Sequence, residues 1–476
     1  MLRRLPRLSS FALIAALAIA APANAQIVLG GDSPTTQPGT SGITLGGAPA
    51  SPVTVTAGAD LRINPDADAK AAFAIPDFAS DDAALARQVT DVIRADLISS
   101  GLFTAVAPAS HASLAADINT KPAFADWTTA GAQVLTLGKI TSADGRLTIQ
   151  FRVYDVAANK QVSGTQYILP ATAWRRGAHK VADEIYAKLT GAAGYFDTRI
   201  AFVSDGPGGK SALNLIDRDG ANAQQPANNI DTMRGGAFSP DGSRIAYSAM
   251  APIPGKASQA QRTTILYDLD TGRRDPLTTL SPQPNADARF SADGRSVIYS
   301  RKVGTNNEIG IMDLPTRKET VLNTSPASDT SPALSPDGSK YVFVSDRGGS
   351  PQLYVARVDG GDVQCASGAA KACRITSGSD ARPTWAPTGD MIAFERKQGA
   401  NTVIGVVKSD GTGEKLLTSG AKDTAPSWSS NGHALVFARD DGKHSKLQII
   451  NRSGSGQHEL ATPGDAYEPT WSPLLK

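Results

Sequence analysis

Apolar residues in the C-terminal part of the chain occur in short segments that alternate with polar turns. Residues 341–344 (Tyr-Val-Phe-Val) and 352–355 (Gln-Leu-Tyr-Val) are two such segments, and turns such as the Asp-Gly pair at 359–360 follow them. Short apolar segments separated by such turns are typical of antiparallel strands joined by hairpins. No helical period appears between residue 195 and the end of the sequence. The pattern therefore predicts an all-β region over residues 195–476.

The same region is repetitive. A bulky apolar anchor is followed by Ser or Ala and, in five of six copies, by a turn that ends in Gly. The anchors are Phe238, Phe290, Leu334, Trp385, Trp428 and Trp471, separated by 43 to 52 residues. Repeats of this length built from short strands are typical of four-stranded propeller blades, in which we expect the three tryptophans to pack between blades. The last anchor has no blade after it, whereas strands expected at 199–203 and 213–216 have no anchor before them. We therefore predict a six-bladed β-propeller whose C-terminal residues 470–474 supply the innermost strand of the first blade.

Residues 53–194 have a different pattern, in which helical and strand periods alternate. Apolar residues from Leu85 to Leu97 recur at helical spacing after an Asp pair that can cap the helix, and Gly101 ends it. The expected elements are strands at 72–75, 133–140, 146–156 and 166–169, and helices at 85–97 and 171–189. Helices packed on one sheet predict a small two-layer α/β domain.

The first 52 residues belong to neither domain. Three arginines precede an apolar stretch at 11–20, and Ala-Asn-Ala then marks a cleavage site between Ala25 and Gln26. This order predicts a signal peptide over residues 1–25. Residues 26–52 are rich in Gly, Pro, Ser and Thr and carry almost no charge, which predicts a flexible tether. Removal of the arginines changes the formal net charge from +2 to −1, so the mature chain has no general attraction to nucleic acid or anionic lipid.

Few residues offer chemistry. The two cysteines, Cys365 and Cys373, predict one local disulfide in an exported protein, and no nearby His supports a zinc site. Residues 204–211 resemble a phosphate loop but precede a strand rather than a helix, which indicates a hairpin turn. Residues 64–68 resemble part of a calcium loop but lack its Gly and Glu. We therefore expect no cofactor, no metal and no catalytic residue.

Several motifs resemble those of one known family. The Phe/Trp-Ser-Pro-Asp-Gly repeats, the segment 344–354 (Val-Ser-Asp-Arg-Gly-Gly-Ser-Pro-Gln-Leu-Tyr) and the terminal Pro-Thr-Trp-Ser-Pro at 469–473 are similar to the TolB family of periplasmic propellers. In the α/β region, residues 75–78 (Ile-Pro-Asp-Phe) and 183–191 (Asp-Glu-Ile-Tyr-Ala-Lys-Leu-Thr-Gly) also fit. The resemblance implies a monomeric, non-catalytic periplasmic hub of the Tol–Pal system. Such a hub would link TolA of the inner membrane to the outer-membrane lipoprotein Pal and support envelope integrity and cell division.

The same resemblance implies that Pal binds at the propeller mouth and TolA at the mature N-terminal segment. The loops that enter the innermost strands carry acidic residues in several repeats. The candidate partner-binding residues are Asp329, Thr330, Asp380, Asp423, Thr424 and Glu468. A ring of carboxylates would present negative potential to a basic partner segment. A structural role for the same residues, with Asp capping the turn and Pro starting the strand, stays open beside this hypothesis.

Two other kinds of propeller protein are alternatives. A propeller-containing serine peptidase needs a Gly-x-Ser-x-Gly elbow on an α/β-hydrolase domain, and the nearest match, at 453–456, falls in an expected turn. A propeller that binds a small ligand would place several aromatic residues in the loops at one mouth, whereas these loops are mainly short and polar. Both alternatives are therefore weaker than the hub.

Overall fold

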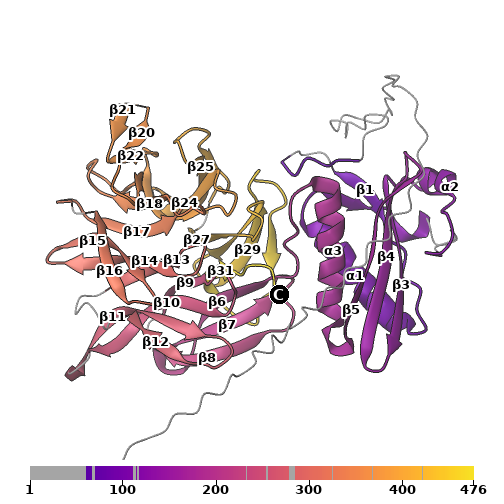
Figure 1. The fold of residues 1–476 in the computed structure, drawn as a ribbon, viewed down its shortest axis with the longest axis horizontal. Coiled ribbons are helices and arrows are strands. Elements are labelled where there is room, and N and C mark those ends of the chain that lie inside the picture. The colour runs from indigo at the N-terminus through magenta and orange to yellow at the C-terminus, as the bar shows by residue number, and fades with distance from the viewer. Residues whose placement is uncertain are drawn as a thin grey trace, which may run out of the picture.

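The computed structural model describes residues 61–476 apart from 67–69, 111–113, 115–116, 232, 254–255, 278–284, 324, 367 and 421. The predicted signal peptide, its cleavage site at Ala25 and Gln26, and the tether at 26–52 lie outside the described residues. Figure 1 shows an α/β region beside a larger part built from strands alone, as the sequence pattern predicts for the fold class. No helix among the described residues is long and apolar enough to cross a membrane.

The α/β domain contains a five-stranded sheet in the order β2-β1-β3-β4-β5. Its strands are β1 (Ala71–Ala74), β2 (Phe103–Ala105), β3 (Val134–Ala143), β4 (Arg146–Asp155) and β5 (Lys160–Pro170). Its helices are α1 (Ala83–Ser99), α2 (Phe124–Thr129) and α3 (Trp174–Thr190), with short 3-10 turns η1 (Pro108–Ser110) and η2 (Ala171–Ala173). Asp82 caps α1 by accepting the Leu85 N–H at 3.0 Å, and Gly191, with a φ of 78°, ends α3.

The helices of this domain cover both faces of the sheet. Apolar side chains of α1 and α3 share one buried cluster with Ile149 and Phe151 of β4. On the other face, Phe124 and Trp127 of the short helix α2 form a second cluster with Leu135 of β3. The sequence pattern predicts α1 and α3 but not α2, because six residues are too few to show a helical period.

Beyond the α/β domain, consecutive strands form four-stranded antiparallel sheets. The first sheet joins β31 (Tyr467–Trp471) to β6 (Arg199–Asp205), β7 (Ser211–Asp217) and β8 (Gln224–Ile230). The second contains β9 (Arg234–Phe238), β10 (Arg244–Ile253), β11 (Lys256–Asp268) and β12 (Arg274–Pro276). The third contains β13 (Asn285–Phe290), β14 (Ser296–Val303), β15 (Asn306–Asp313) and β16 (Lys318–Asn323). The fourth contains β17 (Asp329–Leu334), β18 (Lys340–Ser345), β19 (Gln352–Arg357) and β22 (Ala372–Arg374).

Eight of the remaining strands form one sheet. These strands are β23 (Ser379–Trp385), β24 (Met391–Gln398), β25 (Asn401–Lys408), β26 (Lys415–Leu416), β27 (Lys422–Trp428), β28 (Ala434–Asp440), β29 (Ser445–Asn451) and β30 (His458–Leu460). Its two halves are joined where Thr402 of β25 pairs in parallel with Lys422 of β27. The number of blades depends on whether this sheet counts as one blade or two, so six blades stays a prediction.

Two local features of the strand region match their sequence patterns. The hairpin β20 (Val363–Cys365) and β21 (Gly368–Ala370) precedes β22, and a disulfide joins Cys365 to Cys373. Between β6 and β7, the segment that resembles a phosphate loop forms a hairpin turn with the 3-10 segment η3 (Pro207–Gly209). No helix follows this turn, which removes the physical basis for phosphate binding there.

The turn that follows four of the anchors has a common hydrogen-bond pattern. In the first copy, Ser239 Oγ donates to Asp241 at 2.5 Å and accepts the Arg244 N–H at 2.9 Å. Hydrogen bonds from Ser239 and Ser243 hold the pKa of Asp241 at about 2 against the opposing effect of partial burial. Gly242 has a φ of 73°, a conformation that other residues rarely adopt. The Ser-x-Asp-Gly motif therefore repeats because it builds this turn.

Four of the six anchors are buried, and the other two, Phe238 and Phe290, are partly buried. Trp385, Trp428 and Trp471 are between 5 and 8% exposed, as predicted for core residues. Each indole N–H finds an acceptor; Trp471 Nε1, for example, donates to Thr198 Oγ1 at 2.8 Å. Trp471 also belongs to the cluster that holds Tyr186 of α3 and Tyr195 of the connecting segment. One hydrophobic core therefore runs from the α/β domain into the strand region.

Candidate protein-binding site

Three of the predicted partner-binding carboxylates are buried. Asp329, Asp380 and Asp423, which lie in the innermost strands β17, β23 and β27, are at most 1% exposed. Burial raises the pKa of Asp329, although Arg347 opposes this effect. A ring of solvent-facing acidic groups is therefore wrong for these three positions.

Each of these carboxylates has an arginine partner near the end of the next strand. Both oxygens of each carboxylate accept hydrogen bonds from one guanidinium, at 2.7 to 3.0 Å. The pairs are Asp329–Arg347, Asp380–Arg396 and Asp423–Arg439. Such two-point pairs neutralise the charge that was expected to attract a basic partner, and they favour the structural alternative.

The other predicted residues occupy different positions. Thr330 and Thr424 follow the buried aspartates and are half-buried. Glu468 of β31 is 8% exposed and lines a central cavity of about 180 Å³. The structure thus brings Glu468, but not the three aspartates, to the wall of this cavity.

The cavity is lined by a repeated backbone feature of the innermost strands. In each of these strands the register shifts within the first few residues, which is a β-bulge. At this bulge one residue of every strand has a positive φ, between 47 and 63°. These residues are Gly235, Asp287, Ser331, Arg382, Ala425 and Glu468, and all six line the cavity. Non-glycine residues rarely adopt this conformation, and bulges re-aim side chains next to binding sites.

The six bulge residues differ in chemistry, and several bind one another. Arg382 Nη1 lies 2.5 Å from Glu468 Oε2, and Arg382 Nε lies 3.6 Å from Glu395 Oε1 of β24. Ser331 Oγ donates to Asp287 at 2.9 Å. Burial raises the pKa of Glu395, whereas Arg382 outweighs burial at Glu468 and lowers its pKa. The cavity is therefore a polar site in which one guanidinium serves two carboxylates.

The prediction from the sequence does not include one charged residue of the cavity. Arg289 of β13 lines the cavity two positions after the bulge residue Asp287. The repeats contain a signal for this residue. Arg289 directly precedes the anchor Phe290, and the residue at this place is Ala, Thr or Ser in the other five copies. A comparison of the copies position by position would have found it.

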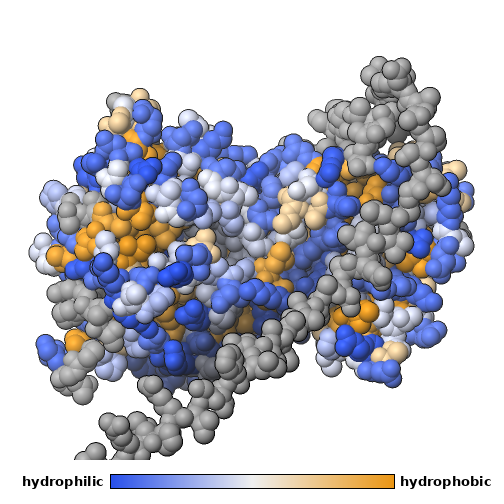
Figure 2. Space-filling model, viewed as in Figure 1, coloured by the Kyte–Doolittle hydropathy of each residue, from blue (hydrophilic) through white to orange (hydrophobic). Residues whose placement is uncertain are grey.

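An exposed apolar patch is a weaker candidate for a binding site than the charged cavity. Figure 2 shows a largely hydrophilic face with apolar side chains gathered over the region where Figure 1 labels β14 to β16. Val303 of β14 and Val321 of β16 are each 36% exposed. Exposed apolar residues of this kind are common on folded proteins. The charged cavity therefore remains the candidate site.

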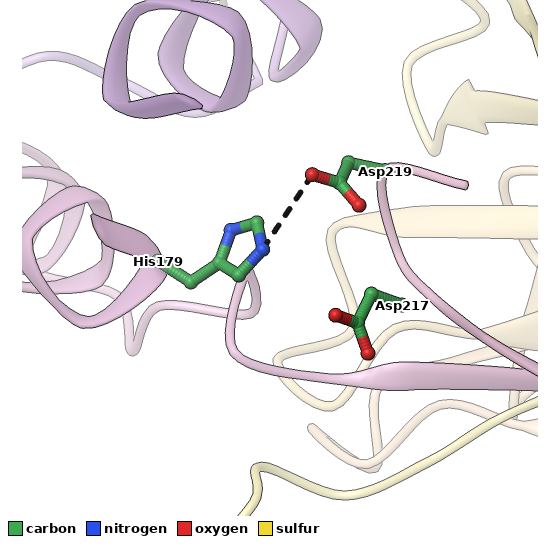
Figure 3. Close-up of side chains that lie close together, drawn as sticks. All are labelled: His179, Asp217 and Asp219. Carbon is green, nitrogen blue, oxygen red and sulfur yellow. Dashed lines mark ion pairs between the residues drawn. The ribbon is translucent and has the colours of Figure 1, made fainter. Parts of the chain in front are cut away.

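The group of residues that could hold a metal lies at the domain interface. His179 of α3 and Asp217 and Asp219 of the first propeller sheet and its turn offer ligand atoms within 4.8 Å of one another (Figure 3). His179 Nδ1 is 2.6 Å from Asp96 Oδ2 of α1, and its Nε2 is 3.6 Å from Asp219 Oδ2. Burial would lower the pKa of His179, but the neighbouring aspartates outweigh burial and raise it to about 9.

Cationic side chains already serve the carboxylates of this group. Arg175 Nη2 lies 2.5 Å from Asp219 Oδ2, Arg218 Nη1 lies 3.3 Å from Asp96 Oδ1, and Arg199 Nε lies 3.4 Å from Asp217 Oδ1. A protonated His179 completes the ion pairs, whereas a metal would have to displace its proton beside the guanidinium of Arg218. We therefore assign the group to an ion-pair network between the two domains.

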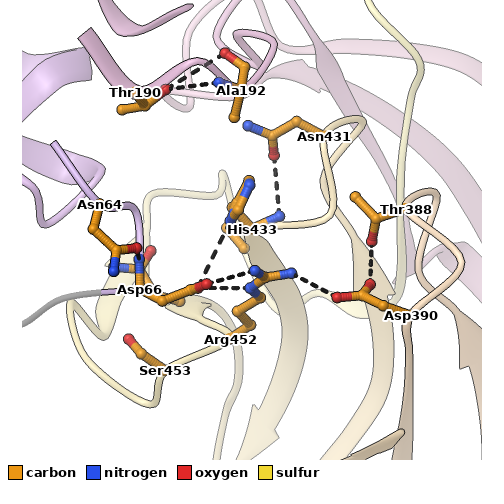
Figure 4. A network of polar contacts seen from close by, with 12 residues as sticks. Asn64, Asp66, Thr190, Ala192, Thr388, Asp390, Asn431, His433, Arg452 and Ser453 are labelled. Atoms are coloured by element: carbon orange, nitrogen blue, oxygen red, sulfur yellow. Dashed lines mark hydrogen bonds and ion pairs between the residues drawn. The ribbon is translucent and has the colours of Figure 1, made fainter. Parts of the chain in front are cut away.

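A second polar network ties the first described residues to the propeller. Arg452, which follows β29, binds both oxygens of Asp66 at 2.7 and 2.6 Å and one oxygen of Asp390 at 3.2 Å (Figure 4). The hydrogen bond from Arg452 lowers the pKa of Asp66. Asn431 donates to the carbonyl of Ala193 at 2.7 Å. Asp66, which the sequence pattern placed in a calcium-like loop, thus has a structural partner.

The fold and this site define a class of protein, a β-propeller that follows an α/β domain and has a polar, charged central cavity. Family models agree with that class. A model described as the TolB beta propeller domain matches residues 186–475, and one described as the TolB amino-terminal domain matches residues 59–162. The chain belongs to the TolB family.

Individual relatives give the same result. The crystal structure of TolB from Acinetobacter baumannii is 29% identical, with a TM-score of 0.72 over 85% of this chain and 97% of that one. A Tol-Pal system protein TolB from Ruegeria sp. (strain TM1040) is 41% identical over 37% of this chain, and one from Bordetella pertussis is 32% identical over 61%. The chain spans 42% and 64% of the length of these two curated relatives.

Proposed function

We propose that this protein is a non-catalytic, periplasmic binding hub of the Tol–Pal system. The observation that carries the proposal is the match of both domains to TolB models, together with a TolB structure similar over 85% of the chain. The relatives are Tol-Pal system proteins, which supports a role in that system here. The signal peptide predicted from residues 1–25 supports export.

Within this role, Pal binds at the opening of the propeller cavity, and TolA binds the N-terminal segment that precedes Leu61. The protein acts as a monomer that links the two membranes of the envelope and supports envelope integrity and constriction at cell division. The cavity supports this choice for Pal because residues with strained backbone and mutually bonded, partly or fully buried side chains form a pre-organised site. Partner binding, rather than catalysis, also agrees with the lack of a nucleophile elbow in the sequence.

The proposal is tested by calorimetric titration of the mature protein with the soluble domain of Pal from the same organism. We expect saturable one-to-one binding. A chain that starts at Leu61 should keep Pal binding and lose binding to the C-terminal domain of TolA. If the folded protein binds neither partner, the Tol–Pal role is wrong although the family assignment stands.

A further inference from the structure

One position of the repeat carries a residue that the propeller fold does not need. The residue directly before the anchor is small in five copies, namely Ala237, Ala333, Thr384, Ser427 and Thr470, and all of these except Ala333 line the central cavity. In the remaining copy it is Arg289. Since five innermost strands pack with a small side chain here, packing does not explain a guanidinium at the same place.

The contacts of Arg289 leave most of its donors unused. Its Nη1 donates to the backbone carbonyls of Gly236 at 3.2 Å and Ala288 at 3.3 Å. Within the described part of the chain, no carboxylate lies within ion-pair distance of this guanidinium. Burial lowers the pKa of Arg289, and the charges of Asp287 and Glu468, which oppose burial, and of Arg382, which adds to it, do not reverse this direction. A cation in this setting gains from any anion that reaches it.

The carboxylates around the cavity have other partners. Glu395 and Glu468 share Arg382, and Asp287 accepts a hydrogen bond from Ser331 Oγ at 2.9 Å. The three buried aspartates of the innermost strands are each paired with their own arginine. Arg289 is therefore the guanidinium that, among the described residues lining the cavity, has no carboxylate partner.

We propose that Arg289 forms a carboxylate-binding subsite that receives an acidic side chain from the protein bound at the propeller cavity. A guanidinium binds a carboxylate through two parallel N–H···O bonds, which gives both attraction and orientation. This inference rests on the proposed function and adds the chemistry of the contact. The sequence predicts acidic residues that attract a basic partner segment. The inference assigns the opposite charges, because the acidic residues are neutralised and the group that the structure describes without an ion-pair partner is a cation.

The inference also predicts how the contact acts. Carboxylates outnumber guanidiniums among Asp287, Arg289, Arg382, Glu395 and Glu468, which all lie in or beside the cavity. The cavity as a whole therefore does not draw an anion from a distance. The contact acts at short range, so we expect it to slow dissociation of the partner and to leave the association rate nearly unchanged.

The first test compares Pal binding to the wild-type protein, Arg289→Gln and Arg289→Lys by surface plasmon resonance and calorimetry. Arg273→Gln is the matched control, because that side chain is 77% exposed in a turn of the outer strands. We expect the Gln variant to dissociate about tenfold faster, the Lys variant to be intermediate, and the control to match the wild type. Melting temperatures of all variants separate a loss of binding from a loss of folding. If the folded Arg289→Gln variant binds Pal within twofold of the wild type, the inference is wrong while the hub remains.

A second test does not need Pal. Malonate, a small dicarboxylate, is compared with chloride at equal ionic strength by thermal shift of the full mature chain. We expect malonate to raise the melting temperature of the wild type and of Arg273→Gln more than that of Arg289→Gln. Equal shifts in all three proteins overturn the subsite. If malonate stabilises the wild type more than Arg289→Gln but the wild type does not bind Pal in the first test, the subsite is supported and Pal is rejected as its partner.

Discussion

The buried charges of this protein differ between the innermost strands and the cavity that those strands enclose. In the strands, Asp329, Asp380 and Asp423 are each held by one arginine, and the same pair recurs from one repeat to the next. At the cavity, the six bulge residues, one from each innermost strand, are all of different types. The charges there are shared, as between Arg382 and two glutamates, or have no ion-pair partner among the described residues. Residues that repeat thus build the fold, and residues that differ between repeats are candidates for binding.

The largest expected effect comes from breaking a repeated pair. Asp423→Ala removes a fully buried carboxylate and leaves Arg439 without its partner. We expect the free energy of unfolding to fall by about 3 to 5 kcal/mol, measured by urea denaturation. Replacing both members, with Asp423→Leu and Arg439→Met, should recover most of this loss because no buried charge then remains unpaired. A single variant as stable as the wild type would contradict the structural role of these pairs.

The domain interface extends the comparison to a buried histidine. The pKa of His179 is raised from 6.5 to about 9, so its contribution to stability is fully present below pH 6.5 and is lost as the pH rises through 9. The contribution is on the order of 3 kcal/mol. We expect the wild type to be more stable than His179→Gln at pH 6 and the difference to shrink by pH 9.5.

Denaturation of both proteins at a series of pH values measures this difference. The subtraction cancels groups that both proteins share, such as Asp183, whose pKa is raised to about 7 mainly by burial. A difference that grows with pH would show that His179 is neutral in the folded protein. That outcome would also reopen the interface as a metal site, because a neutral imidazole can act as a ligand.

These comparisons also show how far the sequence alone reaches. The repeat predicts the strand region because a bulky apolar anchor recurs in every copy and a turn that ends in Gly follows it in five of the six. The C-terminal strand expected at 470–474 overlaps β31, which begins and ends three residues earlier and whose Trp471 pairs with Ile200 of β6. Strand β5 extends over Lys160–Pro170, whereas the sequence predicts only 166–169. The additional residues alternate only weakly between more buried and more exposed positions, so they give little sequence signal.

The candidate site is less predictable, for a physical reason. Asp423 and Arg439 are 16 residues apart in the chain, and only the register of β27 against β28 brings them together. An acidic residue at a loop therefore looks the same in the sequence whether it faces solvent or a buried guanidinium. The surroundings of Arg289 are equally hidden in the sequence, since Gly236, Arg382 and Glu468 reach it from other repeats.

A smaller effect is expected in the cavity. Glu468→Gln removes one of the two carboxylates that share Arg382, and Glu395 remains 3.6 Å from that guanidinium. We expect a loss of about 1 to 3 kcal/mol in urea denaturation, below that of Asp423→Ala, because the cation keeps a partner. Losses of equal size in the two variants would mean that cavity charges are as tightly bound as the repeated pairs.

The smallest effect is expected at an ion pair that lies outside both regions. Arg357 and Asp359 form an ion pair at the end of β19, and their side chains are 38 and 59% exposed. Water and salt screen such a pair, and holding two long side chains in place costs entropy. We expect Asp359→Asn to leave the urea midpoint unchanged within error at both low and high salt. A clear loss of stability in Asp359→Asn that high salt does not reduce would show that an exposed ion pair can stabilise the fold as a buried one does. The burial of a charged pair would then no longer predict how much that pair stabilises this protein.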